Sequence, residues 1–246
     1  MSSAAGEVAR LIRPVRSGDV DEALTGTPQR QPVGGSYTFG GRQGRMSPTR
    51  QRALDDIVPR YLVDPGSLAA ARGTRRITVE IGCGKGDATA AMASVEPEAL
   101  VIACEPNRAM IASLAIAIDV NAIDNVRLWV GDAFDLLGRL DAGSVAEIRI
   151  WFPDPWPKMR QAGKRLIVPA RLALITDALE LGGLLRIATD DSAYAEQALR
   201  AIERERRLEG RTIERPSGRP VTVFEQRGLR AGRAAIDIEA RRVLVT

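Results

Sequence analysis

The stretch Ile77-Thr-Val-Glu-Ile-Gly-Cys-Gly-Lys-Gly86 holds the pattern that decides the fold. It joins an apolar run, which ends at Ile81, to three glycines at alternate positions, and a helical pattern starts directly after them at Asp87. Glycine permits a sharp turn and lets a ligand approach the backbone closely. A buried strand that turns through such a loop into a helix is typical of the first unit of an α/β sheet.

Short apolar runs alternate with longer amphipathic segments from residue 77 to residue 206. The predicted strands are Ile77–Ile81, Leu100–Cys104, Val126–Val130, Val145–Phe152 and Leu184–Ala188. The predicted helices are Asp87–Ser94, Asn107–Val120, Ala133–Leu140, Pro169–Leu181 and Asp191–Arg206. Two later segments, Val221–Glu225 and Ala234–Val245, can add antiparallel strands at one edge. We therefore expect an α/β fold with a mostly parallel seven-stranded sheet and helices on both faces.

The N-terminal part of the chain has a different character. Residues 1–45 are rich in glycine, proline, serine, threonine and arginine and lack periodicity, which predicts a largely disordered basic arm. Ser47 and Pro48 then form a helix start, with the serine as N-cap, and the helix should run to about Arg60. We expect residues 46–246 to form a single domain.

Composition excludes several classes of function. The 246 residues include no histidine, which excludes His-based triads, His-rich metal sites and imidazole acid–base chemistry. Cys83 and Cys104 are too few for a disulfide framework or a structural zinc site, so we expect reduced thiols in the core and no metal centre. No apolar run has the length of a membrane span, and residues 1–16 lack a signal-peptide core. We expect a cytoplasmic protein without a membrane partner.

A second stretch, Ile150-Trp-Phe-Pro-Asp-Pro-Trp-Pro-Lys158, marks the candidate site. Three prolines follow the buried strand and surround Asp154, and proline restricts the backbone, so the loop can hold this carboxylate in one pose. A turn with two core tryptophans is the alternative. Rigid aromatic, acidic and basic groups at the carboxyl end of a strand favour a binding site.

Carboxylates surround the predicted glycine loop. Glu80, Asp87, Asp132 and Asp154 together predict an acidic pocket, which suits a sulfonium cation and repels a pyrophosphate. Glu105 ends the second predicted strand, where an acid bonds the ribose hydroxyls of an adenosine cofactor. S-adenosylmethionine is therefore favoured over a dinucleotide, with Asp132 placed to reach the adenine amino group. Asp132 and Asp87 can instead act only as helix caps.

Basic side chains are unevenly distributed along the chain, whose formal net charge is +4. Residues 23–54 contain arginines and no acid, and residues 155–176 contain lysines and arginines and no acid. Such local fields suit a polyanion such as RNA, although solvated surface usually explains one such run. The candidate phosphate contacts are Lys158, Arg160, Lys164 and Arg165, with Arg215, Arg219, Arg227 and Arg230 on a second edge.

Four motifs resemble those of the bacterial tRNA (guanine-N7)-methyltransferases, the TrmB family. They are Glu80-Ile-Gly-Cys-Gly-Lys-Gly86, Phe152-Pro-Asp-Pro-Trp-Pro-Lys158, Ala188-Thr-Asp190 followed by Tyr194, and Thr222-Val-Phe-Glu-Gln-Arg-Gly228. Residues 42–46 also resemble the segment that precedes the family's catalytic domain. The resemblance implies a Rossmann-like class I S-adenosylmethionine-dependent methyltransferase domain over residues 46–246. It further implies methyl transfer to N7 of a guanine in the tRNA variable loop, usually position 46, with S-adenosylhomocysteine as product.

The resemblance also implies roles for individual residues. Cofactor contacts fall on Glu80, Glu105 and Asp132, with the glycine loop around Gly82 and Gly84, and Asp154 joins them as part of the predicted acidic pocket. Asp154 is in addition the essential, catalytic aspartate. Substrate contacts fall on Lys158, Asp190, Thr222, Val223, Phe224 and Glu225, and Arg160 joins them as a predicted phosphate contact.

Two positions depart from the family pattern. Gln161 stands where the loop usually has a histidine, and Arg233 replaces the histidine of the usual Gly-His. Reduced activity, an altered substrate and a non-catalytic tRNA-binding paralogue are therefore open alternatives. A small-molecule methyltransferase is another, although it leaves the basic stretches unexplained. A monomer and a homodimer are both compatible with the sequence.

The chemistry of guanine N7 agrees with a chain that lacks histidine. N7 carries an in-plane lone pair and no proton, so no general base is required and positioning is the main catalytic device. Asp154 can stabilise the positive charge that develops on the base. Asp190 can accept hydrogen bonds from guanine N1 and N2, unless it or Asp191 only caps the following helix. Because N7 faces the deep groove of A-form RNA, we expect a target in a loop or flipped out, and Trp156 either stacks on it or packs in the core.

Overall fold

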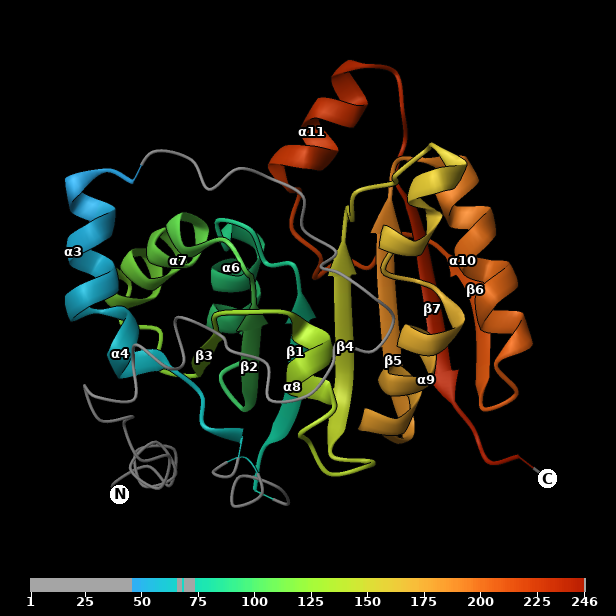
Figure 1. Ribbon diagram of the computed structural model, residues 1–246, viewed down its shortest axis with the longest axis horizontal. Helices are drawn as coiled ribbons and strands as arrows, with labels where there is room; N and C mark the ends of the chain where they lie inside the picture. The colour runs from blue at the N-terminus through green and yellow to red at the C-terminus, as the bar shows by residue number, and fades with distance from the viewer. Residues whose placement is uncertain (1–45, 66–67, 69–73, 246) are drawn as a thin grey trace.

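The computed structural model in Figure 1 describes residues 46–65, 68 and 74–245. The predicted arm, residues 1–45, lies outside the described residues. The strands are β1 (Arg76–Ile81), β2 (Ala99–Cys104), β3 (Val126–Trp129), β4 (Val145–Trp151), β5 (Leu179–Thr189), β6 (Leu208–Ile213) and β7 (Ile236–Arg242). The helices are α3 (Pro48–Asp56), α4 (Val58–Tyr61), α6 (Asp87–Val95), α7 (Arg108–Val120), α8 (Ala133–Leu137), η1 (Met159–Lys164), α9 (Pro169–Ala178), α10 (Ser192–Arg204) and α11 (Val223–Arg230).

The strands form one mostly parallel sheet, as predicted, in the order β3-β2-β1-β4-β5-β7-β6. Strands β1 to β5 pair in parallel, and β7 runs antiparallel to both of its neighbours. The order reverses beside β1, which lies between β2 and β4. In open α/β sheets, a ligand binds at the carboxyl ends of the strands at this kind of reversal.

Apolar side chains of the central strands alternate between two cores, one on each face of the sheet. Leu100 and Ile102 of β2 pack with the apolar faces of α8, α9 and α10, whereas Val101 and Ala103 pack with α3, α6 and α7. These four side chains are fully buried, because helices cover both faces of this central parallel strand. The prediction of helices on both faces is confirmed.

The first described helix starts as the sequence predicts. The Ser47 hydroxyl accepts a hydrogen bond from the Arg50 N–H at 3.3 Å, and Pro48 lies in the first turn, where no backbone donor is needed. The helix then packs against α7, where Arg50 Nε donates to Ser113 Oγ at 3.1 Å.

The fifth predicted strand is longer than expected. The prediction carried the preceding helix to Leu181, but α9 ends at Ala178 and β5 begins at Leu179. Leu179 is fully buried and pairs with Val145 of β4. Burial and strand pairing therefore override the helical propensity of leucine and glutamate in this segment.

One of the two predicted edge strands is wrong. Residues 221–225 were predicted to be extended, but α11 begins at Val223, because the Thr222 side chain accepts the Glu225 N–H at 3.1 Å and caps the helix. The outermost strand is instead β6, which pairs with β7. Its residues 209–212 are exposed, so β6 lacks the apolar pattern that predicts a strand.

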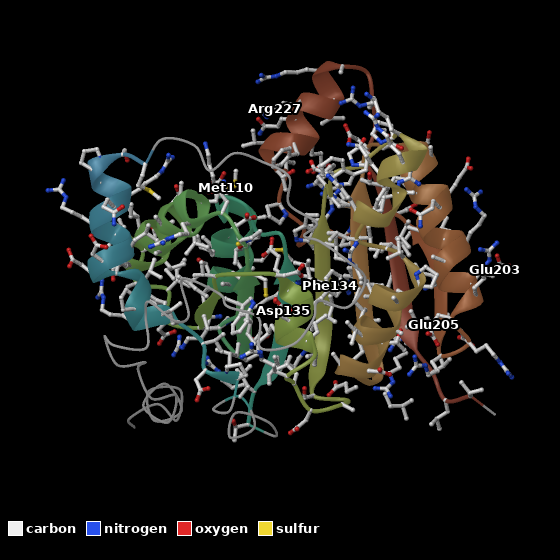
Figure 2. All side chains as sticks on the ribbon, in the orientation of Figure 1. Met110, Phe134, Asp135, Glu203, Glu205 and Arg227 are labelled. Carbon is white, nitrogen blue, oxygen red and sulfur yellow. The ribbon has the colours of Figure 1, made fainter. Side chains whose placement is uncertain are left out.

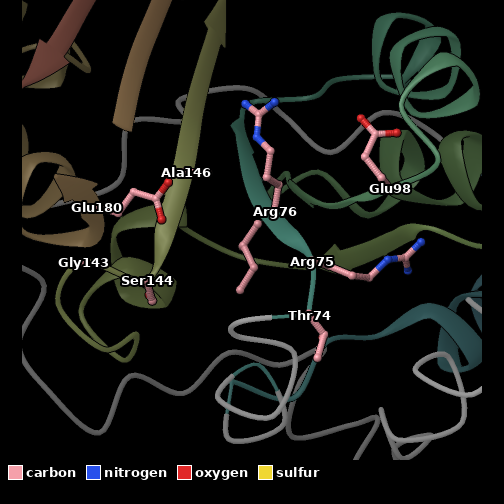
Figure 3. Close-up of a pocket in the computed structure, with 9 residues that line it drawn as sticks. Thr74, Arg75, Arg76, Glu98, Gly143, Ser144, Ala146 and Glu180 are labelled. Atoms are coloured by element: carbon pink, nitrogen blue, oxygen red, sulfur yellow. The ribbon is translucent and has the colours of Figure 1, made fainter. Parts of the chain in front are cut away.

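The carboxyl ends of the parallel strands lie on one side of the sheet, and α11 stands beyond the end of β4 in Figure 1. Figure 2 labels Arg227 on α11 and Met110 near the start of α7, both on this side. A surface hollow at the opposite end, around Arg76 and Glu180, is shown in Figure 3. It lies by the amino ends of β1 and β4, away from the edge where ligands bind in such sheets.

Among the described residues, no helix is long and apolar enough to cross a membrane. The described part of the chain also contains no group of three or more histidine, cysteine, aspartate or glutamate side chains that could hold a metal ion.

Candidate active site

Glu105 connects the glycine loop after β1 to the end of β2. Its buried carboxylate accepts the Gly84 N–H at 3.1 Å through Oε2 and the Asn107 N–H at 2.9 Å through Oε1. Gly82 and Gly84 have φ angles of 76° and 58°, a left-handed conformation that favours glycine. A Cβ atom added to Gly82 would meet nothing within 4 Å, so this side of the loop is open.

Glu80, a predicted cofactor contact, supports the glycine loop from inside the fold. It is 2% exposed, and its carboxylate accepts a hydrogen bond from Thr89 Oγ1 of α6 at 2.7 Å. Burial raises the pKa of Glu80, while the Thr89 hydrogen bond and the charge of Arg149 oppose the rise. The carboxylate thus fastens the end of β1 to the helix that follows the loop.

Asp132 caps a helix, which was the alternative to its predicted contact with the cofactor. Its carboxylate accepts the Phe134 N–H at 2.9 Å at the start of α8, yet the residue stays half-buried. After burial, the charges of Asp132, Glu80 and Glu105 raise the pKa of the Cys104 thiol. These three carboxylates therefore act on the end of β2, and two of them, Glu80 and Asp132, belong to the predicted acidic pocket, which stays a prediction.

The remaining sequence predictions around this pocket have mixed outcomes. Asp87 is exposed at the first position of α6, and the N-cap of that helix is Gly86, so Asp87 is not the cap. Cys83 and Cys104 are free and buried, which confirms their predicted place in the core. Burial raises both thiol pKa values well above their ordinary value, so neither is a ready nucleophile.

The proline loop after β4 has a constrained backbone. Phe152 and Trp156 adopt positive φ angles of 50° and 42°, which cost about 1–3 kcal/mol each for residues other than glycine. Arg165 holds the loop from the side, because its Nε donates to the Pro155 carbonyl at 3.0 Å and its Nη2 to the Trp156 carbonyl at 3.1 Å. The guanidinium predicted to grip a phosphate therefore positions the loop.

Asp154 lies exposed on this loop, which follows β4, the strand beside β1. Burial raises the pKa of Glu105, the N–H groups of Asn107 and Gly84 lower it, and the charge of Asp154 raises it further. Glu105 follows β2 and Asp154 follows β4, and both strands pair with β1, so the two residues lie at the same edge of the sheet on either side of the glycine loop. The motif after β4 and the strand end after β2 thereby form one site.

The rest of the proline loop presents basic groups. Lys158 and Arg160 are exposed, at the start of the short helix η1. Trp156 is half-buried, and Lys164 Nζ lies 4.7 Å from the centre of its ring, within range of a cation–π contact. One face of the indole is thus covered by a lysine, and the partial burial of the ring does not correspond to a fully packed core position, so stacking on a base stays a prediction for the other face.

The two aspartates after β5 have separate roles. Asp191 caps α10 by accepting the Tyr194 N–H at 2.8 Å, as foreseen for one of the pair. Asp190 is half-buried, and its Oδ2 accepts a hydrogen bond from Arg233 Nε at 2.9 Å. Asp190 is therefore the carboxylate left for a ligand at the end of β5.

Helix α11 presents its first turn to solvent and buries one acid. Val223 is 46% exposed and Phe224 is 54% exposed, while Glu225 is only 4% exposed. The Glu225 carboxylate pairs with Arg219 at 2.8 Å and with Arg215 at 2.9 Å. Of the predicted substrate contacts on this helix, Thr222 is used as its cap, Glu225 is enclosed by arginines, and Val223 and Phe224 are free to meet a partner.

Arg219 is a buried structural residue that the sequence analysis placed wrongly. It was predicted to contact phosphate, but it is 3% exposed and also pairs with Asp237 of β7 at 2.7 Å. Its guanidinium lies over the rings of Trp151 and Phe152, 5.8 Å and 5.6 Å from their centres. A buried aspartate in a strand requires a paired cation. Asp237, within the predicted C-terminal strand, was therefore the sequence signal for a buried arginine.

Comparisons with known proteins agree with this geometry. A family model described as "Putative methyltransferase" matches residues 74–238. The tRNA (guanine-N(7)-)-methyltransferase of Methylococcus capsulatus is 39% identical over 82% of this chain and 91% of the relative. The enzyme of the same name from Leifsonia xyli is 37% identical over 81% of this chain and 92% of the relative.

Solved structures show the same fold at low sequence identity. A variant of the 16S rRNA (adenine(1408)-N(1))-methyltransferase from Catenulisporales acidiphilia, solved with its cosubstrate SAM, aligns with a TM-score of 0.52 and 18% identity over 74% of this chain and 92% of that one. The antibiotic-resistance methyltransferase Kmr aligns with the same TM-score and identity over 74% of this chain and 94% of that one. The likeness to these two structures concerns the fold alone. By its family model and its relatives, this chain belongs to the TrmB family of bacterial tRNA (guanine-N7)-methyltransferases.

Proposed function

We propose that the protein transfers a methyl group from S-adenosylmethionine to N7 of a guanine in tRNA, at position 46 of the variable loop. Relatives that this chain matches over most of their length carry the guanine-N7 activity in their names. The observation that carries the proposal is the open glycine loop after β1, which Glu105 anchors and which lies between the strand that ends at Glu105 and the strand that leads to Asp154. A rigid carboxylate facing a cofactor pocket is what this chemistry needs.

The residues at the ends of β1 and β2 fit S-adenosylmethionine. The open side of Gly82 leaves room for a ligand against the loop backbone. Glu105 would accept the ribose hydroxyls, and Asp132 would reach the adenine amino group. The carboxylates that act on the end of β2 create a negative potential that favours a cation over a pyrophosphate. We infer that Glu80, Gly82, Gly84, Glu105, Asp132 and Asp154 hold the cofactor.

The chain supplies positioning and electrostatics for the transfer. When bound, the cofactor supplies an electrophilic methyl group on a sulfonium sulfur and is left as S-adenosylhomocysteine. Guanine N7 has a lone pair and no proton, so the absence of histidine from the sequence is no obstacle. Asp154 would stabilise the positive charge that develops on the base, an effect worth about 10²–10³ in rate. The strained loop and Arg165 hold that carboxylate in place.

The exposed groups around the site suit an RNA substrate. Lys158 and Arg160 would contact phosphates, Asp190 would accept hydrogen bonds from guanine N1 and N2, and Phe224 offers an exposed ring for a neighbouring base. The remaining predicted contacts, Thr222, Val223 and Glu225, lie on the same helix. Since tRNA is a cytoplasmic substrate, we expect the protein to act there.

The test is a methylation assay on unmodified tRNA with methyl-labelled cofactor, followed by borohydride reduction and aniline cleavage, which cuts the RNA at N7-methylguanine. We expect one cut in the variable loop. Asp154→Ala should abolish it, whereas the control Asp141→Ala, at an exposed position of the opposite edge, should keep it. Cofactor binding without label in tRNA would contradict the proposed function and favour a non-catalytic or small-molecule role.

A further inference from the structure

Asp190, the carboxylate that would read the guanine under the proposed function, does not stand alone in the structure. Its Oδ2 accepts a hydrogen bond from Arg233 Nε at 2.9 Å. The side chain of Asp190 is 23% exposed and that of Arg233 is 53% exposed. An ion pair of this exposure adds little to folding stability, so its effect must be sought in the geometry of the carboxylate.

The end of α11 brings Arg233 to this place. The Arg233 N–H donates to the Gly228 carbonyl at 2.9 Å, and the Gly232 N–H donates to the Leu229 carbonyl at 3.0 Å. This pair of bonds is the Schellman motif, which turns the chain back at the end of a helix. The strand β7 then starts at Ile236, opposite Thr189 of β5, so the turn lies beside Asp190.

Gly228 provides the close approach that the pair requires. A Cβ atom at this position would lie 2.5 Å from Asp190 Oδ2 and 3.1 Å from its Cγ. Any larger residue would therefore push the carboxylate away from α11. The carboxylate is confined between the backbone of the helix on one side and the guanidinium of Arg233 on the other.

This confinement has a chemical consequence for recognition. The guanidinium binds Oδ2, and an Asp carboxylate in an ion pair is an acceptor only. The other oxygen, Oδ1, stays available for donors, and guanine presents the N1 and N2 hydrogens on its Watson–Crick edge. A fixed acceptor discriminates better than a rotating one, because misplacement of the substrate is costly.

We propose that Arg233 is a positioning residue for guanine recognition, which holds the Asp190 carboxylate in the orientation that accepts the N1 and N2 hydrogens of the target base. The inference rests on the proposed function. Arg233 acts through Asp190 and makes no contact of its own with the reacting atoms.

The experiment compares steady-state methylation of two matched tRNAs, one with guanosine and one with inosine at the target position. Inosine lacks the N2 amino group and keeps N7. For the unaltered protein, we expect inosine to lower kcat/KM about tenfold, the effect of one hydrogen bond to a charged group. Arg233→Gln should lower kcat/KM for guanosine about tenfold and bring the guanosine-to-inosine ratio close to one. Arg233→Lys should restore part of the ratio, since it keeps the charge and loses the planar fork.

Two further variants separate positioning from folding and from phosphate binding. Gly228→Ala leaves Arg233 in place but displaces Asp190, so it should also reduce the ratio. Arg200→Gln removes an arginine that is 57% exposed and paired with Glu196 on α10, and it should leave the ratio unchanged. Cofactor affinity should stay within about twofold of the original in all variants.

The outcomes are distinct. An unchanged guanosine-to-inosine ratio in Arg233→Gln would overturn the inference, and equal losses for the two tRNAs would assign Arg233 to a phosphate contact. An unaltered protein that does not discriminate against inosine would overturn the inference as well. Failure of the unaltered protein to methylate either tRNA would overturn the proposed function as well.

Discussion

Glu105 is the residue at which the two halves of the candidate site meet. It accepts backbone hydrogen bonds from the glycine loop and from Asn107, and it senses the charge of Asp154 on the proline loop. A carboxylate in this position can accept hydrogen bonds at both oxygens only while it is ionised, because protonation makes one oxygen a donor. Its protonation state should therefore control cofactor binding.

The raised pKa of Glu105 gives a prediction about pH. Burial raises this pKa above the ordinary value of a glutamate, so the free protein takes up a proton at higher pH than an exposed glutamate does. The bound ribose favours the ionised form, so the free state holds more protons than the bound state. Cofactor affinity should then fall as the pH falls, by up to about tenfold per pH unit below the raised pKa.

Calorimetric titration of the cofactor across acidic to neutral pH checks this. Glu105→Gln should bind more weakly at neutral pH and should lose the dependence on acidification that Glu105 causes. An affinity that rises on acidification would contradict the assignment of Glu105 to the ribose.

Asp154 gives a second prediction about a single residue. Asp154→Asn keeps the size of the side chain and removes its charge, so kcat for tRNA should fall about 10²–10³-fold at saturating cofactor. The cofactor Kd should rise by about tenfold at most, because several other groups hold the cofactor. Single-turnover methylation and a binding titration separate the two effects. A kcat that recovers fully at high cofactor concentration would place Asp154 in binding alone.

Helix α11 is held at the site by buried charges. Arg219 pairs with Glu225 of the helix and with Asp237 of β7, and it covers the aromatic residues at the end of β4. The helix, the antiparallel edge and the start of the proline loop are thereby joined through one guanidinium. A buried ion pair is costly to break, because one charge remains uncompensated.

Glu225→Ala should therefore lower the free energy of unfolding by about 3–5 kcal/mol. Urea denaturation followed by circular dichroism measures this, with Glu203→Ala, an exposed position on α10, as the control that should stay within about 0.5 kcal/mol. If Glu225 served only to contact the substrate, its replacement would leave the stability unchanged and weaken tRNA binding alone.

The proline loop gives a prediction about Arg165, which bonds the carbonyls of Pro155 and Trp156. Arg165→Gln removes the bridge and should lower kcat about tenfold, because Asp154 loses its fixed pose. Cofactor affinity should change much less. The control is Arg206→Gln, an exposed arginine after α10. If the tRNA KM rose and kcat stayed constant, the guanidinium would be a phosphate contact, as the sequence first suggested.

At the scale of elements, alternation of apolar runs and amphipathic segments predicted β1 to β5, β7 and the helices between them, because buried parallel strands have a strong pattern. Residues 221–225 were mistaken for a strand because valine and phenylalanine are strand formers, and the Thr222-to-Glu225 cap outweighs this preference. The edge strand β6 has four exposed residues in a row and hence no detectable pattern.

The site residues, too, could be predicted only where a local sequence pattern places them. Asp154, Glu105 and Asp190 follow the ends of parallel strands, so their meeting at one edge could be predicted. The pairing of Arg219 with Glu225 and Asp237 joins segments whose contact depends on where α11 lies, which no local pattern reveals.

At the scale of the whole molecule, one group of exposed basic side chains belongs to α11 and to the loop after β4, and α11 stands beyond the carboxyl end of β4 in Figure 1. Arg227 and Arg230 lie exposed in the last turn of that helix, and Lys158 and Arg160 lie exposed after the proline loop. Each contact to a phosphate releases counterions, so tRNA affinity should depend steeply on salt.

Arg227→Gln combined with Arg230→Gln should reduce the slope of log K against log salt by about 1.4, at about 0.7 for each phosphate contact in a single-stranded region. Filter binding of tRNA over a range of salt concentrations measures the slope. The matched control replaces Arg204 and Arg206, which are exposed at the far end of α10, and should keep it. Equal slopes for the two double variants would remove α11 from the RNA interface.

The most direct test of the account is single-turnover methylation of two tRNAs that differ in one atom, with guanosine or 7-deazaguanosine at the target position. The account predicts that the protein binds both RNAs with similar affinity, methylates the guanosine form, and leaves the 7-deaza form unmethylated, because the carbon that replaces N7 has no lone pair. Methyl transfer at the same rate to both would contradict N7 as the acceptor, and with it the role of Asp154 in stabilising a charged base.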